Sequence, residues 1–196
     1  MTTAPLTPAE AEGLIARFRN QTSKKKGFEE RTGIPTAAYE MVAAKDIFLM
    51  MAPAGMGGVN TRPGVAGPEG VTVNVCECPP GNGPLMHIHQ RTGETFMCLK
   101  GRFELRMGRT PEGEVVTHLD PFDLVPMPPG LWRQFRNVTE ETAYLLVITA
   151  GGRESFGDIY YTPEVGAEIA QRFGGTVRDT FVNKLGYHFE VPQPAQ

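Results

Sequence analysis

The sequence predicts an all-β protein of short antiparallel strands, and three observations support this fold class. The chain has 196 residues, of which 40% are hydrophobic, enough for one domain with a core of its own. It contains 23 glycines and 17 prolines, about a fifth of the chain, so it turns often. No helix-length hydrophobic pattern interrupts residues 71–149. Parallel βαβ units are therefore excluded there, and an antiparallel barrel or sandwich is favoured.

The segment before the β-region is predicted to be helical. Residues 7–10 read Thr-Pro-Ala-Glu, which places a capping threonine before a proline at the first helical position. This helix is expected to reach about Asn20, and another short helix is expected over 37–44. Residues 47–51 form a compact apolar run, which predicts a buried strand. Residues 53–70 hold six glycines and three prolines, so we expect a lid or a long rim loop without regular structure.

Strand patterns then follow in quick succession, separated by turn residues. The predicted strands are 71–78, 85–89, 95–107, 114–119, 124–126, 133–138 and 143–149, with a hairpin turn over Arg109–Gly113. A further helix is predicted from Thr162-Pro163 to Phe173, ending at Gly174-Gly175. The expected organisation is an N-terminal helical extension (1–44), a β-barrel (45–150) and a C-terminal extension with one helix (151–196).

Composition and charge exclude several classes of partner. The chain carries 19 basic and 22 acidic residues, a formal charge of −3, so nucleic acid is not an expected partner. The one basic run, Lys24–Lys26, is interpreted as a solvated segment. No apolar stretch approaches the roughly 20 residues that a bilayer requires, and residues 1–10 lack the pattern of a signal peptide. Three cysteines, an odd number, favour free thiols in a reducing compartment, so we expect a cytoplasmic protein without membrane contact.

Two predicted strands are apolar on both faces. Residues 96–99 and 144–148 show no alternation, so both faces must be covered. The inner face closes the barrel. The outer face predicts a homodimer, with the terminal extensions as the competing explanation.

Two histidines and a glutamate are the residues best suited to chemistry. His87 and His89 are two apart in a predicted strand, so both side chains lie on one face. Residues 90–93 turn the chain, and Glu94 begins the returning strand. From adjacent antiparallel strands, the three groups can converge on one ion at about 2.0–2.2 Å. This set leaves open positions on the metal. The alternative is two surface histidines beside an incidental glutamate.

The spacing around these residues resembles the first motif of the cupin superfamily. Gly81 is followed after five residues by His87-x-His89, after four more by Glu94 and after six more by Gly101. The resemblance covers residues 71–149, roughly two fifths of the chain. It implies a small jelly-roll-like β-barrel with a metal ion inside.

A second cupin-like motif follows, with two departures. Pro128, Gly130 and Asn137 fall at the expected spacing, but Phe122 replaces the first glycine. Arg133 replaces the histidine that would be the fourth ligand, and arginine has no lone pair to offer. Three arrangements follow: a metal held by His87, His89, Glu94 and water; no metal, with Arg133 paired to Glu94; or Gln134 as a ligand, disfavoured because it points to the other face.

The expected function is that of a mononuclear metal-dependent enzyme of the dioxygenase or isomerase type. His87, His89 and Glu94 would hold one divalent ion (Fe, Ni, Mn or Zn), and its substrate would be a small carboxylate or enol. Arg133 and Glu94 are the candidate catalytic residues. The expected substrate contacts are Arg133, Phe135, Trp132 and Phe96. The alternative is a non-catalytic small-molecule-binding or structural cupin with a metal-free barrel.

Overall fold

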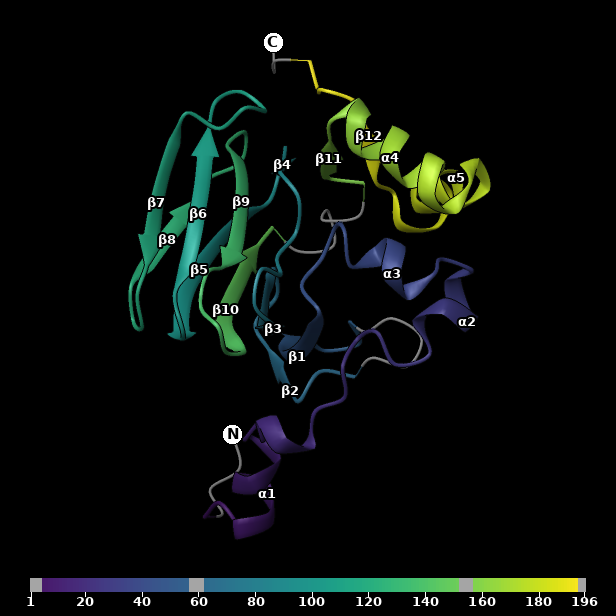
Figure 1. The fold of residues 1–196 in the computed structure, drawn as a ribbon. Helices are drawn as coiled ribbons and strands as arrows, with labels where there is room; N and C mark the ends of the chain where they lie inside the picture. The colour runs from purple at the N-terminus through teal and green to yellow at the C-terminus, as the bar shows by residue number, and fades with distance from the viewer. Residues whose placement is uncertain (1–4, 57–61, 152–156, 194–196) are drawn as a thin grey trace.

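The computed structural model describes residues 5–56, 62–151 and 157–193, which form two six-stranded sheets with helices beside them (Figure 1). The first sheet has, in spatial order, β2 (Val65–Gly67), β1 (Asp46–Pro53), β3 (Val71–Cys78), β10 (Ala143–Ala150), β5 (Gly93–Lys100) and β8 (Leu124–Met127). The second has β12 (His188–Phe189), β11 (Ile159–Tyr161), β4 (His87–His89), β9 (Trp132–Asn137), β6 (Phe103–Gly108) and β7 (Val115–Leu119).

The fold is strand-rich and cupin-like, as predicted. The predicted closed antiparallel barrel is not what the structure has. Over the described part of the chain, the two sheets share no strand, so hydrogen bonding does not close a barrel. Two pairs are parallel, β1 with β2 and β11 with β12. One strand of each pair, β2 or β12, lies outside the run of strands predicted over residues 71–149. The sequence pattern therefore did not indicate these parallel pairs.

The segment 53–70 is not wholly irregular, contrary to the sequence prediction. β1 extends to Pro53, and β2 pairs with its last three residues. Part of the predicted lid, residues 57–61, lies outside the described residues. The flanking parts that are described are tied to a sheet edge, since the Gly64 N–H donates to the Leu49 carbonyl at 3.0 Å.

The predicted strands agree closely with the observed ones, except that the run 95–107 is two strands. β5 ends at Lys100 and β6 begins at Phe103, on either side of a turn at Gly101. Gly101 has φ 86°, and a Cβ there would lie 2.6 Å from the Ala143 Cβ. Only glycine fits this turn, because both the backbone conformation and the space exclude a side chain.

The helices differ more from expectation. The Thr7 capping box is present, but α1 (Pro8–Gly13) ends early, and a 3-10 turn covers Phe18–Asn20. α2 (Phe28–Thr32) and α3 (Thr36–Tyr39) follow. α4 (Pro163–Phe173) is as predicted. A second C-terminal helix, α5 (Gly175–Leu185), was not predicted, because Gly174 bends the chain and a new helix starts immediately after it.

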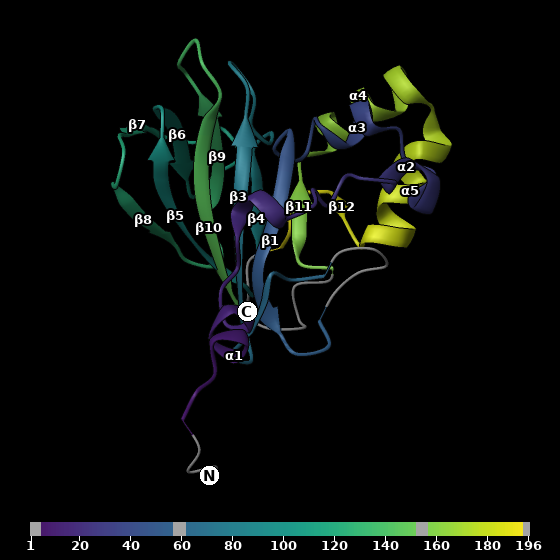
Figure 2. The same cartoon turned by 90° about the horizontal axis from the view of Figure 1, so that it is seen from below.

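The molecule has two hydrophobic cores. One lies between the sheets and includes Phe96, Phe103 and Phe135. The other joins the two ends of the chain, with Ile34 and Tyr39 from the N-terminal segment packed with Ile169 and Phe181 from α4 and α5. Both views show α2 and α3 beside α4 and α5, on one side of the sheets (Figures 1 and 2). We call this group of four helices the helical cap.

The outer face of the first sheet is partly covered by the chain itself. The Phe18 ring lies 4.9 Å from the Phe48 ring and 5.9 Å from the Tyr144 ring, both edge to face. This contact supports the competing explanation for the two-sided apolar strands, and the homodimer stays a prediction. Among the described residues, no helix is long and apolar enough to cross a membrane.

Candidate metal centre

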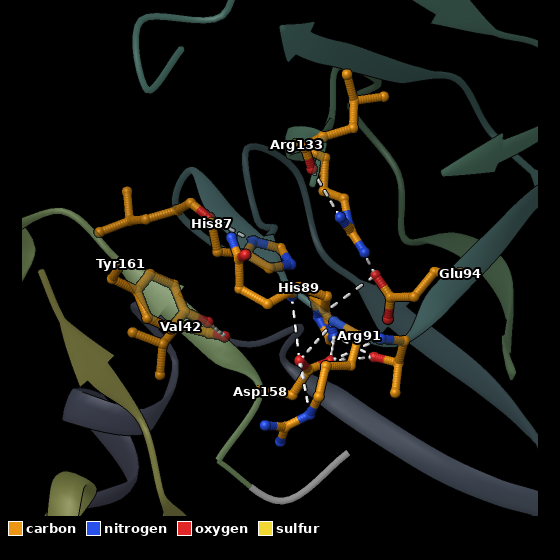
Figure 3. Close-up of polar contacts among 12 residues, drawn as sticks. Val42, His87, His89, Arg91, Glu94, Arg133, Asp158 and Tyr161 are labelled. Atoms are coloured by element: carbon orange, nitrogen blue, oxygen red, sulfur yellow. Dashed lines mark hydrogen bonds and ion pairs between the residues drawn. The ribbon is translucent and has the colours of Figure 1, made fainter. Parts of the chain in front are cut away.

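His87, His89 and Glu94 converge as the sequence predicts, but from two different sheets (Figure 3). Their candidate ligand atoms all lie within 4.8 Å of one another. β4, which carries both histidines, pairs with β9 and β11, whereas β5, which carries Glu94, pairs with β10 and β8. The expectation of one hairpin is therefore wrong. Residues 90–92 lead the chain from one sheet to the other, and the three side chains meet between them.

The environment of His87 leaves one ring nitrogen free. Its Nδ1 lies 2.9 Å from the Leu85 carbonyl oxygen, which can only accept a hydrogen bond, so Nδ1 carries the proton. Burial, together with the nearby His89 and Arg133, lowers the pKa of His87 to about 3. His87 is therefore neutral, with the Nε2 lone pair available to a metal ion.

His89 is held in the same tautomer by a hydroxyl and a buried acid. The Thr92 hydroxyl donates to Asp158 Oδ2 at 2.6 Å. Because its hydrogen is used there, the Thr92 oxygen accepts from His89 Nδ1 at 2.8 Å. This leaves the Nε2 of His89 with a free lone pair as well. Both imidazoles thus have the orientation and protonation that ligands to a metal require.

Asp158 is a residue of this site that the sequence did not indicate. It is fully buried and accepts the backbone N–H groups of residues 90, 91 and 92 at 3.1, 2.7 and 2.9 Å. Burial alone would raise the pKa of Asp158, but the nearby His89 and the hydrogen bonds from Thr92 and the backbone N–H groups lower it to about 2. The carboxylate therefore fixes the connection between the two sheets. It lies 66 positions from Thr92 along the chain, and no motif marks it.

Glu94 is paired with the residue that replaces the fourth ligand. Arg133 Nε donates to Glu94 Oε2 at 3.1 Å, and Nη1 donates to the Leu131 carbonyl at 2.7 Å. Arg133 has no exposed surface, and its Nη2 has no hydrogen-bond partner within the described ranges. Burial would raise the pKa of Glu94, but His89 and Arg133 together hold it below its ordinary value. Glu94 Oε2 also lies 3.6 Å from His89 Nε2, so the carboxylate faces both groups.

The three residues line a cavity of about 580 Å³. Of the aromatic residues predicted to contact substrate, Phe135 lines this cavity. Phe96 and Trp132 are buried but are not among its lining residues. Phe96 packs edge to face against Phe135 at 5.4 Å and so supports it from behind. Trp132 precedes Arg133 on β9, so its side chain takes the other face of the strand. Arg133 is likewise behind the cavity wall, with Glu94 in front of it.

The cavity wall also includes residues that the sequence did not single out. Lys24 and Tyr39 come from the N-terminal segment, and Tyr161 and Tyr187 come from the C-terminal one. The Tyr161 hydroxyl donates to the Val42 carbonyl at 2.8 Å, which ties the two segments together (Figure 3). The remaining histidines are elsewhere, as expected. His118 is exposed on the edge strand β7, and His188 stacks on Tyr160 at 4.2 Å.

The donor set fits a divalent transition metal ion. Two neutral imidazole nitrogens and one carboxylate suit Fe(II), Mn(II), Ni(II) and Zn(II) alike. Arg133 Nε donates to one oxygen of the Glu94 carboxylate, and the carboxylate keeps further lone pairs for a metal ion. His87, His89 and Glu94 could therefore hold one ion, and Arg133 cannot be a ligand.

Comparisons with known proteins agree with the geometry. The family described as "Cupin domain" matches residues 74–149. No curated protein matches the chain. A protein from Bacillus halodurans has 18% identity over 45% of this chain and 68% of its own, with a TM-score of 0.43. A sugar phosphate isomerase from a cupin superfamily, from Silicibacter pomeroyi, has 28% identity over 43% of this chain and 52% of its own, with a TM-score of 0.38. A conserved protein with a double-stranded β-helix domain, from Klebsiella pneumoniae, has 22% identity over 53% of this chain and 85% of its own, with a TM-score of 0.41.

The matched region contains all three candidate ligands and Arg133. It begins within β3 and ends within β10, and so includes most of both sheets and neither group of terminal helices. The chain spans about half the length of the isomerase that it resembles. Residues 74–149 thus form a cupin domain, and the protein is a cupin-domain protein.

Proposed function

We propose that this protein is a mononuclear metal-dependent enzyme of the dioxygenase or isomerase type, acting on a small carboxylate- or enol-bearing substrate. One observation carries the proposal. Two imidazoles whose Nδ1 atoms are already hydrogen-bonded present free Nε2 lone pairs beside a carboxylate, all within 4.8 Å and at a cavity wall. Two histidines that lay beside an incidental glutamate would have no reason to share this orientation.

The charges of the site favour an anionic substrate. The His87 imidazole is neutral, and the charges of Glu94 and Arg133 offset each other. A divalent ion would then bring two further positive charges, and the buried Asp158 carboxylate behind His89 already faces Arg91 at 3.6 Å. When bound, such an ion supplies a Lewis acid that polarises a substrate oxygen, and Fe(II) in addition supplies a site for O₂. An anion such as a carboxylate or enolate would restore neutrality.

In this proposal the chain's own residues orient the reacting groups. Arg133 holds Glu94 in place through Nε, and its Nη2 has no hydrogen-bond partner in the described part of the chain. Glu94 accepts or returns a substrate proton through the oxygen that a metal ion does not use. Phe135 forms an apolar wall that excludes water. The proposed terminal extensions, residues 1–44 and 151–196, serve the β-domain 45–150 by contributing Lys24, Tyr39, Tyr161 and Tyr187 to the cavity wall.

Metal analysis tests the proposal directly. Protein purified without a histidine tag is expected to contain about one divalent transition metal ion per chain, and His89→Ala is expected to lose it. His118→Ala is the matched control, since His118 is an exposed histidine far from the triad. Equal, substoichiometric metal in all three proteins would refute the metal centre.

Turnover separates the enzyme from a binding protein. The Fe(II)-loaded protein is expected to consume O₂ with at least one member of a panel of aromatic diols and β-diketones. A substrate that is isomerised without O₂ uptake, followed by NMR, would identify the isomerase type. His89→Ala should abolish either activity.

A metal-free binding protein is the alternative, and one observation favours it. The Arg133–Glu94 contact at 3.1 Å already neutralises both charges without any metal. This alternative predicts no metal in the purified protein, no turnover, and thermal stabilisation of the metal-free protein by small anions.

A further inference from the structure

Three consecutive lysines have three different environments, although the sequence suggested one solvated run. Lys26 is exposed. Lys25 is buried and pairs with Glu40 at 2.6 Å. Lys24 is half-buried and lines the cavity that contains the metal centre. The interpretation of this run as a solvated segment is therefore wrong for two of its three members.

The backbone of Lys24 is fixed by its neighbours. Its N–H donates to the Ile47 carbonyl in β1 at 2.8 Å, and its own carbonyl accepts from Arg31 Nη2 at 3.1 Å. The lysine is thus attached to the edge of a sheet on one side and to α2 on the other. Its side chain reaches the cavity from a defined point on the wall.

No described side chain neutralises the Lys24 ammonium. Lys24 forms no ion pair among the described residues, and the carboxylates of Glu40 and Glu94 are engaged elsewhere, Glu40 with Lys25 and Lys45, and Glu94 with Arg133. The ionisable group that acts on Lys24 is the thiol of Cys76, and burial raises the pKa of this thiol to about 12, so it is neutral. Burial lowers the pKa of Lys24 below its ordinary value. A half-buried cation without a counter-charge is costly, and an anion entering the cavity would remove that cost.

Asn74 adds a second unused polar group to the same cavity. It lies on β3 two residues before Cys76, so the two side chains share a face. Asn74 is only 7% exposed, and its Oδ1 has no hydrogen-bond partner in the described part of the chain. A buried amide oxygen without a partner is uncommon and indicates a missing donor. β3 and β5 are separated by β10 alone, so Asn74 and Glu94 start from strands about 10 Å apart.

We propose that Lys24 and Asn74 form a second subsite in this cavity, which binds a carboxylate at the end of the substrate remote from the metal centre. This inference rests on the proposed function, because it places the other end of the substrate at His87, His89 and Glu94. The Lys24 ammonium donates both to the carboxylate and to Asn74 Oδ1, and Asn74 Nδ2 donates to the carboxylate. The substrate class is a small acid with a carboxylate at one end, an oxygen donor at the other, and a mainly apolar middle against Ile47 and Val147.

Glutarate, a five-carbon dicarboxylate, is the probe for this subsite. Its binding is measured by isothermal titration calorimetry on the Zn(II)-loaded full chain, and inorganic phosphate and acetate serve as comparison anions. We expect glutarate to bind more tightly than acetate, because two subsites are engaged. Lys24→Met is expected to weaken glutarate binding at least tenfold, and Asn74→Leu a few fold, with unchanged metal content. Lys24→Arg should restore most of the affinity, and Lys26→Met, the matched control, should leave it unchanged.

The outcomes separate this inference from the proposed function. Equal glutarate affinity in wild type and Lys24→Met, or no glutarate binding by the wild type, overturns the subsite even where the metal content is normal. If phosphate binds more tightly than glutarate and its binding depends on Lys24 in the same way, the carboxylate assignment is overturned. A protein without metal refutes the metal centre, and Lys24-dependent anion binding by that protein still supports the subsite.

A measurement on the wild type keeps the inference testable if Lys24→Met does not fold. Reductive methylation, followed by mass spectrometry, gives the modification rates of Lys24 and Lys26 in the same sample. Glutarate is expected to slow the modification of Lys24 severalfold and to leave that of Lys26 unchanged. Equal rates with and without glutarate would overturn the subsite.

Discussion

The two sides of the cavity are built in opposite ways. The metal side takes His87, His89 and Glu94 from one short stretch of chain, and Thr92, Asp158 and Arg133 fix their orientation. The rest of the wall, the cap side, takes Lys24 and Tyr39 from one end of the chain and Tyr161 and Tyr187 from the other, joined through the helical cap. The two sides meet where the Tyr161 ring lies 5.5 Å from the His87 ring. The metal side therefore depends on hydrogen bonds between close polar groups. The cap side depends on packing between segments more than a hundred residues apart.

The largest expected effect tests the polar pairing on the metal side. In metal-free protein, Arg133→Met should reduce the free energy of unfolding by about 3–5 kcal/mol, because it leaves the Glu94 carboxylate buried without its partner. Zn(II) should restore part of this loss, since the ion supplies positive charge beside the same carboxylate. Urea denaturation with and without Zn(II) measures both quantities.

Arg136→Met is the matched control for this prediction. Arg136 lies three positions further along β9, and its side chain is half-exposed in an ion pair with Glu104 at 3.3 Å. An exposed pair contributes at most about 1 kcal/mol, so the variant should be nearly as stable as wild type. Equal losses for both arginines would show that the Arg133–Glu94 contact has no special role.

The next effect concerns the buried acid behind His89. The Asp158 carboxylate accepts four hydrogen bonds. In Asp158→Asn, the NH₂ group of the amide would face some of these donors. We expect a loss of about 2–3 kcal/mol in unfolding free energy and a 10- to 100-fold weaker affinity for Zn(II). Competition with a chelator measures the affinity.

The exposed acid Asp179 provides the comparison for Asp158. It lies in α5 and contacts only its neighbour Arg178 among the contacts described, so Asp179→Asn should change neither stability nor metal affinity appreciably. Wild-type Zn(II) affinity in Asp158→Asn would mean that the acid fixes the backbone turn alone and does not tune His89.

These differences explain what the sequence predicted and what it did not. The strands and the triad were predictable because alternation, turn residues and the motif spacing are local properties, and β3, β10 and α4 have nearly the expected bounds. The assignment of β4 and β5 to one hairpin failed, because a link as short as residues 90–92 suits a hairpin as well as a crossing between sheets. Lys24 reaches the cavity, and Asp158 reaches the backbone of residues 90–92, only through tertiary contacts, which no local pattern records.

A smaller effect tests the helical cap. Tyr161→Phe removes the hydroxyl that donates to the Val42 carbonyl at 2.8 Å and leaves that buried acceptor unpaired. We expect a loss of about 1–2 kcal/mol in urea denaturation and unchanged metal content, since the hydroxyl does not contact the triad. Tyr160→Phe is the control, because no hydroxyl contact is described for Tyr160, whose ring stacks on His188. Metal loss in Tyr161→Phe would show that the two sides of the cavity are coupled.

The smallest expected effect is a gain in the free energy of unfolding. It concerns Phe122, the second departure from the cupin motifs. Phe122 stands where the motif has glycine, and it adopts φ 75° with 77% of its surface exposed. The left-handed conformation costs a residue with a Cβ about 1–2 kcal/mol, whereas glycine adopts it freely but loses more entropy on folding. Phe122→Gly should therefore be more stable than wild type by roughly 0.5–1 kcal/mol in urea denaturation.

Phe122→Ala separates the two possible causes of such a gain. Alanine removes the exposed ring but keeps the Cβ, and in both variants the backbone N–H can still donate to the Cys98 carbonyl at 2.7 Å. If backbone strain is the cause, only glycine stabilises the protein. Equal gains for alanine and glycine would instead assign the cost to the exposed ring. In the first case, the replacement of the motif glycine has a purely local cost, whereas the replacement of the motif histidine by Arg133 changes the charge balance of the whole cavity.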